Sequence, residues 1–437
     1  MEETGTASGG LRREVGLAGA SLLGLGSMVG TGVFVSIGIA AGVAGPSLIA
    51  ATLLAALVAT ANGLSSAQLA AAHPVSGGTY EYGYLWLSPA FGFAAGWMFL
   101  LAKSASAATA ALGFGGYFLD MAGFQSAGWR VATGVIATLA ITAFVAGGIR
   151  RSNRGNAVIV GLTLGALLAL VAFSIPIVVS QGLDNFSPFL PERAAGSGGY
   201  AALLHGAALM FVAFTGYGRI ATLAEEVRDP GRIIPPAVIV TMGIVTVLYL
   251  GVAFAGVGVL GATEFGLSAA RTAAPLEALA AALGVGWLPL VIALAAITAM
   301  LGVLLNLVLG LSRVLLAMAR RGDAPALFRR IGHAKSSPVR AVWACGLGVA
   351  ALALIGDVRT TWSFSAFTVL LYYGITNMAA LRLPPEKRLF QRWIPAFGLV
   401  GCLGLAFWVE STIWIVGSAL LALGLAGHVI RHRLLPT

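Results

Sequence analysis

The chain has 437 residues and a net charge of +10; 58% of its residues are hydrophobic, only 10% are charged, and its mean hydropathy is +0.92. Soluble globular domains carry about 25% charged residues, so the composition excludes a protein folded mainly in water. The two cysteines, Cys345 and Cys402, lie within apolar stretches, which excludes a disulfide framework and a cysteine-rich metal site. The sequence therefore predicts an all-α polytopic membrane protein.

Apolar segments long enough to cross a bilayer recur along the whole chain. Each span takes about 20 residues, which leaves room for about twelve transmembrane helices in a single membrane domain, 1–437. No small-residue cleavage site follows the first apolar stretch, so we expect no removable signal peptide. The expected spans lie near 17–42, 46–71, 90–119, 130–149, 156–180, 199–222, 234–260, 285–316, 339–356, 361–381, 394–409 and 411–430.

Lysine and arginine gather in alternate loops between these spans. Of the 26 basic residues, 21 lie in one alternating set of loops and in the two terminal segments. The loops of the opposite side hold only Arg130, Arg193, Arg271 and Arg359, and Lys103 lies inside a span. Positive residues are retained on the cytoplasmic side, so we expect a multi-pass protein of the cell (inner) membrane with its N- and C-termini in the cytoplasm. The same distribution argues against nucleic-acid binding, which needs basic residues clustered on one soluble face.

Two spans contain glycine clusters near their middle, GSMVGTG at 26–32 in the first and FTGYG at 214–218 in the sixth. Glycine favours broken helix, and unwound backbone at membrane depth is tolerated only where it is buried in protein or lines a cavity. Corresponding breaks in spans one and six predict an inverted repeat of five plus five helices. The first repeat is expected in 1–195, the second in 196–382, and two extra helices with a cytoplasmic tail in 383–437.

The two breaks suit a zwitterionic substrate. The N-terminus of a half-helix offers unpaired N–H groups and partial positive charge to a carboxylate, while exposed C-terminal carbonyls suit an ammonium group. Main chain alone can therefore hold the backbone end of an amino acid. We expect a secondary active transporter that moves an amino acid, or a close relative, across the bilayer.

Four motifs, in the right order, resemble those of the amino acid–polyamine–organocation (APC) superfamily of permeases. They are GSMVGTGVF at 26–34, PVSGGTY at 74–80, FVAFTGYGRIATLAEEVRDPGRIIP at 211–235 and LSRVLLAMARRGDAP at 311–325. The resemblance runs nearly end to end. It implies the LeuT-type fold and transport of amino acids by alternating access.

The resemblance also implies a set of substrate-binding residues. It places Thr31 and Gly32 at the substrate carboxylate, and the carbonyls of Met28, Val212 and Thr215 near the amino group. Phe214 and Gly216, in the second break, complete the expected site.

Some residues depart from the family pattern. Val212 stands where many members have a bulky aromatic lid, so either Phe211 or Phe214 serves instead or the outer gate is looser. Gly218 occupies a position that is often acidic, and Arg219 follows it. These differences favour neutral or acidic amino acids over basic ones, because no carboxylate is left to receive a cationic side chain.

Lys103 is the most unusual residue of the chain, because it lies about 11 residues, or roughly 16 Å, into the third span and thus near the midplane. A centred lysine costs about 2.5–3.5 kcal/mol on insertion scales, so its position indicates a function. A structural contact with unwound carbonyls and snorkelling are the alternatives. The resemblance places Lys103 beside the substrate pocket, whereas Thr163 replaces the lysine that some members carry on helix five.

Two roles for Lys103 follow. Burial disfavours the charged form of a lysine, so this side chain is expected either to carry the coupling proton or to contact an acidic group of the substrate. We favour proton coupling; an exchanger or exporter without proton coupling is the alternative.

Other functional classes fit the sequence less well. A channel needs a continuous polar lining, which the spans lack. No HExxH, GxSxG or paired intramembrane carboxylates occur, so we expect no enzymatic activity, no cofactor and no metal. His205 in span six is expected to be packed and hydrogen-bonded rather than a proton relay. The substrate, the direction of transport, the choice of proton or sodium and the oligomeric state stay open.

Overall fold

The computed structural model describes residues 15–75, 77–124, 126–148, 153–181, 183–191, 198–222, 227–330 and 338–434. In these ranges every regular element is a helix, and the only extended pairing is an isolated bridge between Val15 and Val227. The α-helices are α1 (Leu17–Met28), α2 (Ile37–Ala44), α3 (Leu48–Ala72), α4 (Thr79–Trp86), α5 (Pro89–Met121), α6 (Ala127–Ala146), α7 (Asn153–Gln181), α8 (Gly199–Phe214), α9 (Gly218–Thr222), α10 (Pro230–Leu260), α11 (Ala262–Arg271), α12 (Pro275–Ala282), α13 (Leu288–Arg321), α14 (Val339–Ala353), α15 (Val358–Leu381), α16 (Trp393–Ala406) and α17 (Ser411–Leu434). Short turns of other helix types are η1 (Gly32–Ser36), η2 (Gly45–Ser47), η3 (Asp184–Phe186), η4 (Thr215–Tyr217), η5 (Ala326–Arg329) and η6 (Pro385–Lys387).

The membrane spans follow the predicted segmentation. Nine helical segments of the described chain are long and apolar enough to cross a bilayer. One of them, Leu17–Ala72, holds the first two predicted spans, and the shorter apolar helices α14 and α16 match the ninth and eleventh. The all-α polytopic fold is therefore confirmed. The short helices α4, α11 and α12, which lie between spans, were not predicted.

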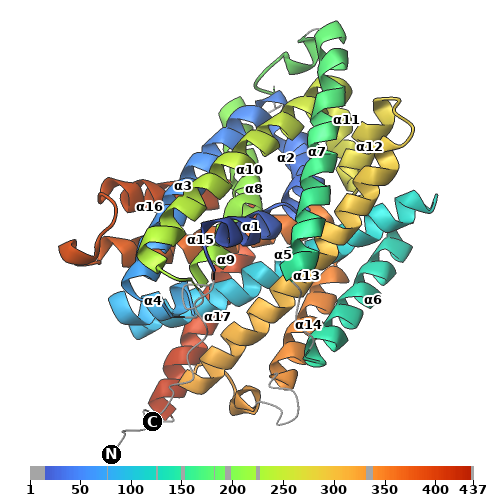
Figure 1. Cartoon of the computed structure of the whole chain (residues 1–437). Helices are drawn as coiled ribbons and strands as arrows, with labels where there is room; N and C mark the ends of the chain where they lie inside the picture. Colours follow the sequence, from blue (N-terminus) through green and yellow to red (C-terminus); the bar gives the residue numbers. More distant parts are fainter. Residues whose placement is uncertain are drawn as a thin grey trace, which may run out of the picture.

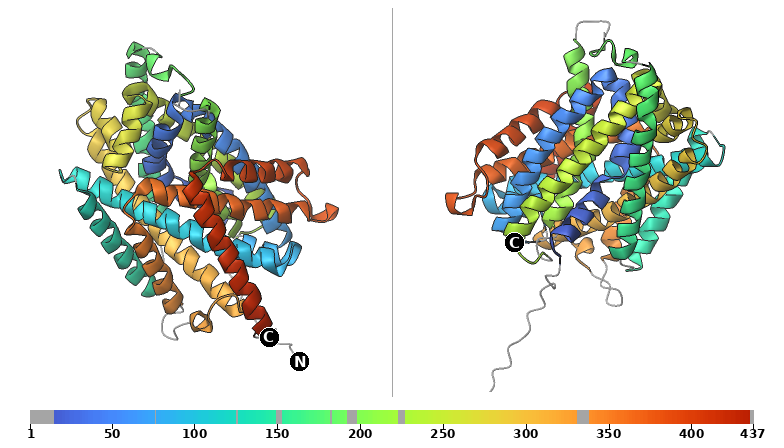
Figure 2. Two further views of the ribbon diagram at one scale, coloured as in Figure 1. Left: turned by 180° about the vertical axis from the view of Figure 1, so that it is seen from behind. Right: turned by 45° about the horizontal axis from the view of Figure 1, so that its top comes forward.

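Long helices cross at steep angles around a buried centre (Figure 1). Helix α5 runs through the bundle and packs against α13 and α15, while α3 packs against α8 and α10. The last helix, α17, lies across the outside of the bundle (Figure 2, left). Only 11% of its most apolar stretch is buried within the chain, so most of its apolar surface lies on the outside of the bundle.

Small residues and paired hydroxyls hold the central helices together. Within hydrocarbon, burial of apolar surface gives little drive for helix association, so close packing and side-chain hydrogen bonds take its place. Between α5 and α15, Ser106 Oγ lies 2.7 Å from Ser365 Oγ, and Thr109 Oγ1 lies 2.8 Å from Thr361 Oγ1. The serine pair satisfies two buried hydroxyls, and the threonine pair adds a contact between helices to the bonds that these hydroxyls make with carbonyls of their own helices.

A buried carboxylate ties three elements together at the end of α13. The helix stops at Gly322, whose φ of +91° is a left-handed cap that favours glycine. The next residue, Asp323, accepts hydrogen bonds from the hydroxyls of Tyr80 (2.7 Å) and Tyr84 (2.6 Å) on α4, and lies 3.1 Å from Nδ1 of His428 on α17. Burial and the hydrogen bond to Asp323 raise the pKa of Tyr80 far above its usual value, so its hydroxyl stays a donor.

Candidate substrate site

The first span is interrupted where the sequence predicted it. Helix α1 ends at Met28, and the chain resumes as a π-helical turn, η1. At the junction the N–H groups of Val33 and Phe34 both point to the carbonyl of Gly30, each at 3.1 Å. The regular ladder of α-helical hydrogen bonds is broken here, so main-chain groups on both sides of the break become available to side chains or a ligand.

The sixth span is interrupted as well. Helix α8 ends at Phe214, a 3-10 turn follows at η4, and α9 continues from Gly218. Thr215 caps the end of α8, because its N–H and its Oγ1 (2.8 Å) both donate to the carbonyl of Val212. Both predicted interruptions are thus confirmed.

The two breaks lie against each other through reciprocal glycine contacts. A Cβ atom added to Gly32 would fall 2.6 Å from Cβ and 2.8 Å from Cα of Ala213. A Cβ atom added to Gly216 would fall 2.5 Å from the carbonyl oxygen of Ser27 and 2.6 Å from a side-chain carbon of Met28. Each break therefore supplies one glycine that lets the other approach to backbone contact.

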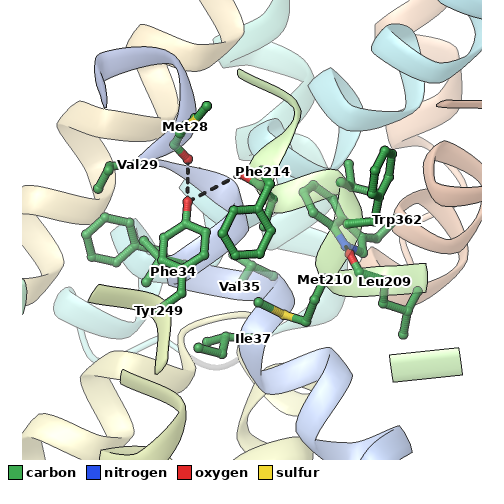
Figure 3. Packing of buried hydrophobic residues seen from close by; sticks show 14 of the residues in the cluster. Met28, Val29, Phe34, Val35, Ile37, Leu209, Met210, Phe214, Tyr249 and Trp362 are labelled. Carbon is green, nitrogen blue, oxygen red and sulfur yellow. Dashed lines mark hydrogen bonds between the residues drawn. The ribbon is translucent and has the colours of Figure 1, made fainter. Parts of the chain in front are cut away.

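Two buried tyrosines donate to the carbonyls of the breaks. The hydroxyl of Tyr249 on α10 lies 2.7 Å from the Met28 carbonyl and 3.4 Å from that of Ala213 (Figure 3). The hydroxyl of Tyr373 on α15 donates to the Thr215 carbonyl at 3.1 Å. Sequence reasoning did not identify either tyrosine. A tyrosine within an apolar span indicates that its hydroxyl needs a hydrogen-bond partner inside the protein. Which carbonyl that partner is depends on how the helices pack, and the sequence does not show this.

The three carbonyls expected to receive the substrate's amino group each have a donor within the protein. Met28 has Tyr249, Val212 has Thr215 and Thr215 has Tyr373. A carbonyl oxygen carries two lone pairs. Val212 also accepts the Thr215 N–H and Thr215 also accepts the Gly218 N–H, so of the three only the Met28 carbonyl has a single donor among the described residues. The site residues thus lie together at the crossing of spans one and six.

Thr31 differs from these groups because its polar atom is unsatisfied. Its side chain is 3% exposed, and Oγ1 has no hydrogen-bond partner among the described residues. A buried hydroxyl without a partner costs free energy, and such groups are commonly satisfied by water or ligand. This unsatisfied hydroxyl fits a position beside a substrate carboxylate.

Lys103 reaches the second break. It is the fifteenth residue of the 33-residue helix α5, and its Nζ donates to Thr215 Oγ1 at 3.0 Å. It forms no ion pair with any carboxylate in the described part of the chain. The lysine is therefore beside the expected binding residues, with a neutral hydroxyl as its partner. Thr163 lies on α7, the fifth of the predicted spans, where the resemblance expects a lysine in some members. Its hydroxyl donates to the Ile159 carbonyl of the same helix at 2.7 Å.

The aromatic residues of α8 pack inward at the site. The ring of Phe214 lies 5.1 Å from that of Tyr249, and the ring of Phe211 lies 5.9 Å from that of Tyr373, measured between centroids. Both phenylalanines are fully buried, and Val212 between them is 5% exposed. The packing does not single out either ring as the lid.

A charged cluster holds the start of α8. His205 Nε2 lies 3.3 Å from Glu410 Oε2, and the Arg359 guanidinium reaches the other carboxylate oxygen at 2.8 Å. Burial opposes ionisation of Glu410, but His205 and Arg359 outweigh it and hold the pKa of this carboxyl far below its usual range. His205 is thus buried beside an acidic partner; the predicted packing is confirmed, whereas its Nε2 forms no hydrogen bond among the described residues. In the described ranges no group of three or more His, Cys, Asp or Glu residues is placed to hold a metal ion.

Comparison with known proteins identifies the kind of chain that carries this site. The family model for amino acid permeases matches residues 19–430. An uncharacterised transporter of Mycobacterium tuberculosis is 40% identical over 422 residues, covering 97% of this chain and 92% of the relative. Two relatives at 28% identity differ in their named substrates: a branched-chain amino acid permease of Bacillus subtilis (93% of this chain, 90% of the relative) and a chloroplast cationic amino acid transporter of Arabidopsis thaliana (82% and 64%).

Proposed function

The chain belongs to the amino acid permease family, and we propose on that premise that it is a proton-coupled secondary transporter of neutral or acidic amino acids. Membership makes it a multi-pass membrane protein of a family that transports small molecules, amino acids foremost. We further propose that it works by alternating access, with the proton as coupling ion and a preference for neutral or acidic substrates. An exchanger or exporter without proton coupling is the competing function.

The contact between Lys103 and Thr215 carries the proposal. A protonated lysine offers three N–H donors and a full charge next to the break in span six, whereas the neutral amine offers two donors and a lone pair. Low-dielectric surroundings make the charged form of Lys103 costly in free energy. The lysine ammonium is therefore stabilised most when the carboxylate of a substrate lies near it. Proton and substrate would then favour each other's binding, which is the thermodynamic requirement for coupled transport.

Recognition of the amino acid would be shared between the two breaks. The C-terminal carbonyl of Met28 suits the ammonium group, with the carbonyls of Val212 and Thr215 beside it, and the unsatisfied Thr31 hydroxyl suits the carboxylate. Among the described residues, no carboxylate hydrogen-bonds or ion-pairs with these groups. A basic side chain would meet Lys103 without a counter-charge, so neutral and acidic substrates are preferred.

We also propose how the chain is oriented in the membrane and that its first ten spans form an inverted repeat. An excess of basic residues in alternate loops supports cytoplasmic termini in the inner membrane. The reciprocal contacts of Gly32 with Ala213 and of Gly216 with Ser27 support two inverted repeats, 1–195 and 196–382, since each half plays the same part toward the other. Residues 383–437 then form the appendage of two further helices.

Purified protein in liposomes tests this function. Radiolabelled L-leucine, L-glutamate and L-arginine are offered with an imposed pH gradient, with no gradient, and with a sodium gradient. We expect leucine or glutamate to accumulate only when the outside is acidic, with little accumulation of arginine. Saturable exchange that ignores the pH gradient would support the uncoupled exchanger instead.

A further inference from the structure

Two helix C-termini converge on one tyrosine hydroxyl at the centre of the molecule. Met28 is the last residue of α1, and Ala213 lies in the last turn of α8. Carbonyls at these positions carry the partial negative charge of their helices, so two negative helix ends meet at Tyr249. Figure 3 shows the hydroxyl between them, with Phe214 packed on the ring.

The Tyr249 hydroxyl cannot satisfy both carbonyls. It has one hydrogen to donate, and it gives that hydrogen to Met28 at 2.7 Å while Ala213 is left at 3.4 Å. A charged ammonium group carries three donors, and its hydrogen bonds to carbonyls are stronger than those of a neutral hydroxyl. The position occupied by the tyrosine hydrogen is thus better suited to a cation.

We propose that the Tyr249 hydroxyl is a placeholder for the ammonium group of the substrate. In the empty carrier the hydroxyl satisfies the Met28 carbonyl, and on binding the ammonium takes over that hydrogen bond. Tyr249 is then a positioning residue that keeps the two helix ends paired while no substrate is present. This inference rests on the proposed amino acid substrate.

A placeholder has a consequence that a purely structural hydrogen bond lacks. Removal of the hydroxyl destabilises the empty carrier, where buried carbonyls lose their donor, more than the loaded carrier, where the ammonium supplies one. The difference appears as tighter binding, by thermodynamic linkage. Loss of a structural hydrogen bond would instead leave binding unchanged or weaken it.

Tyr249→Phe removes only the hydroxyl and tests the inference. Binding of L-leucine, L-alanine and L-glutamate is measured by calorimetry on the purified full-length chain, and uptake is measured in liposomes. We expect a lower melting temperature without ligand, a Kd about three- to tenfold lower than that of the wild type, and a lower maximal uptake rate because release is slower. Unchanged or weaker binding would overturn the placeholder.

Tyr117→Phe is the matched control. The Tyr117 hydroxyl on α5 is equally buried and donates to the Phe34 carbonyl at 2.8 Å, which lies within η1 and not at a helix C-terminus. This variant should melt at a lower temperature with no gain in affinity. If the wild type binds none of the three amino acids, the proposed function fails; if it binds them and only the Tyr249→Phe gain is missing, the placeholder alone fails.

A spectroscopic measurement keeps the inference testable should Tyr249→Phe not fold. 3-Fluorotyrosine is placed at position 249 or 117 of the otherwise unchanged chain and observed by fluorine NMR. Addition of L-leucine should shift the signal at 249 and not the one at 117, and the corresponding α-hydroxy acid, which lacks the ammonium group, should shift neither. An unmoved signal at 249 in protein that binds leucine would overturn the placeholder.

Discussion

Lys103 on α5 and Thr215, the first residue of η4, are joined by a hydrogen bond of 3.0 Å from the lysine Nζ to the threonine Oγ1. The same oxygen donates to the carbonyl of Val212 at 2.8 Å. A change in the charge of Lys103 therefore acts through a single hydroxyl on the end of a broken helix. The proposed protonation of Lys103 would in this way be connected to the main-chain groups proposed to hold the substrate.

Lys103→Ala should separate coupling from transport. Without the amine no proton is carried, so accumulation of leucine or glutamate against an imposed pH gradient should fall to the background level. Counterflow exchange should persist, because the main-chain site remains. Lys387→Ala, which removes a lysine 5.6 Å from the Trp86 ring at the surface, is the control and should accumulate substrate normally. A Lys103→Ala protein that still concentrates substrate would exclude this lysine as the proton carrier.

Thr31→Val should abolish uptake while the protein stays folded. Valine has almost the same shape as threonine, and the lost hydroxyl has no internal partner to leave unpaired, so stability should change by less than about 1 kcal/mol. Affinity should fall by at least tenfold if that hydroxyl binds a carboxylate. Thr52→Val is the control for both measurements, because it removes a buried hydroxyl that, among the described residues, donates to the Leu48 carbonyl one turn earlier and to no other group. Normal uptake by Thr31→Val would remove Thr31 from the site.

Gly32→Ala and Gly216→Ala should each lower both the melting temperature and the uptake rate. The added methyl group overlaps backbone of the opposite break, which forces the two spans apart. Gly243→Ala in α10 is the control, because a Cβ atom there meets nothing within 4 Å. It should stabilise the helix by about 0.5–1 kcal/mol and leave uptake unchanged. Equal melting temperatures for all three variants would contradict the close crossing of the breaks.

Glu277 on α12 should make the stability of the protein depend on pH. Burial, and then the negative charge of Asp120, raise the pKa of Glu277 from 4.5 to about 7. The folded state therefore holds this proton more tightly than the unfolded state, and stability falls as the pH rises from about 4.5 to 7 and levels off above that. Glu277→Gln should remove this fall, so that the variant melts at the higher temperature at pH 8 and the two proteins converge at pH 5. Glu264→Gln, an exposed change in α11, should keep the wild-type slope; a shared slope in all three proteins would refute the assignment.

Hydrophobic patterning predicts most of this fold, because bilayer thickness imposes one length on every span. The breaks were also predictable, since GSMVGTG and FTGYG place several glycines within single apolar segments. Helices α11 and α12 were not, because they have only 10 and 8 residues and give no apolar run of spanning length.

Contacts within the site were less accessible to sequence reasoning. The expected depth of Lys103 in the third span was obtained by counting along one helix, but its partner Thr215 lies 112 residues away in the sequence. Gly32 was predicted as a ligand group, and the structure adds that it spaces the helices, so Gly32→Leu would displace α8 rather than test the carboxylate contact alone. Tyr249 and Tyr373 donate to carbonyls that only the assembled bundle brings within reach.

Gly32 contacts the backbone of Ala213, and Gly216 contacts that of Ser27 in the same way. These two contacts make the crossing of the two spans a fixed pivot about which the helices can rotate. Nothing deformable lies between the chains at that point, so they can roll about each other but cannot slide past or move closer. Helix α8 extends 16 residues from the crossing, which is a length of about 24 Å. A tilt of α8 by roughly 10° at the crossing would therefore move its far end by about 4 Å. In the proposed alternating-access cycle, a small rotation at the crossing would therefore become a displacement of several ångströms at the far end of α8, enough to open or close a path on that side of the membrane.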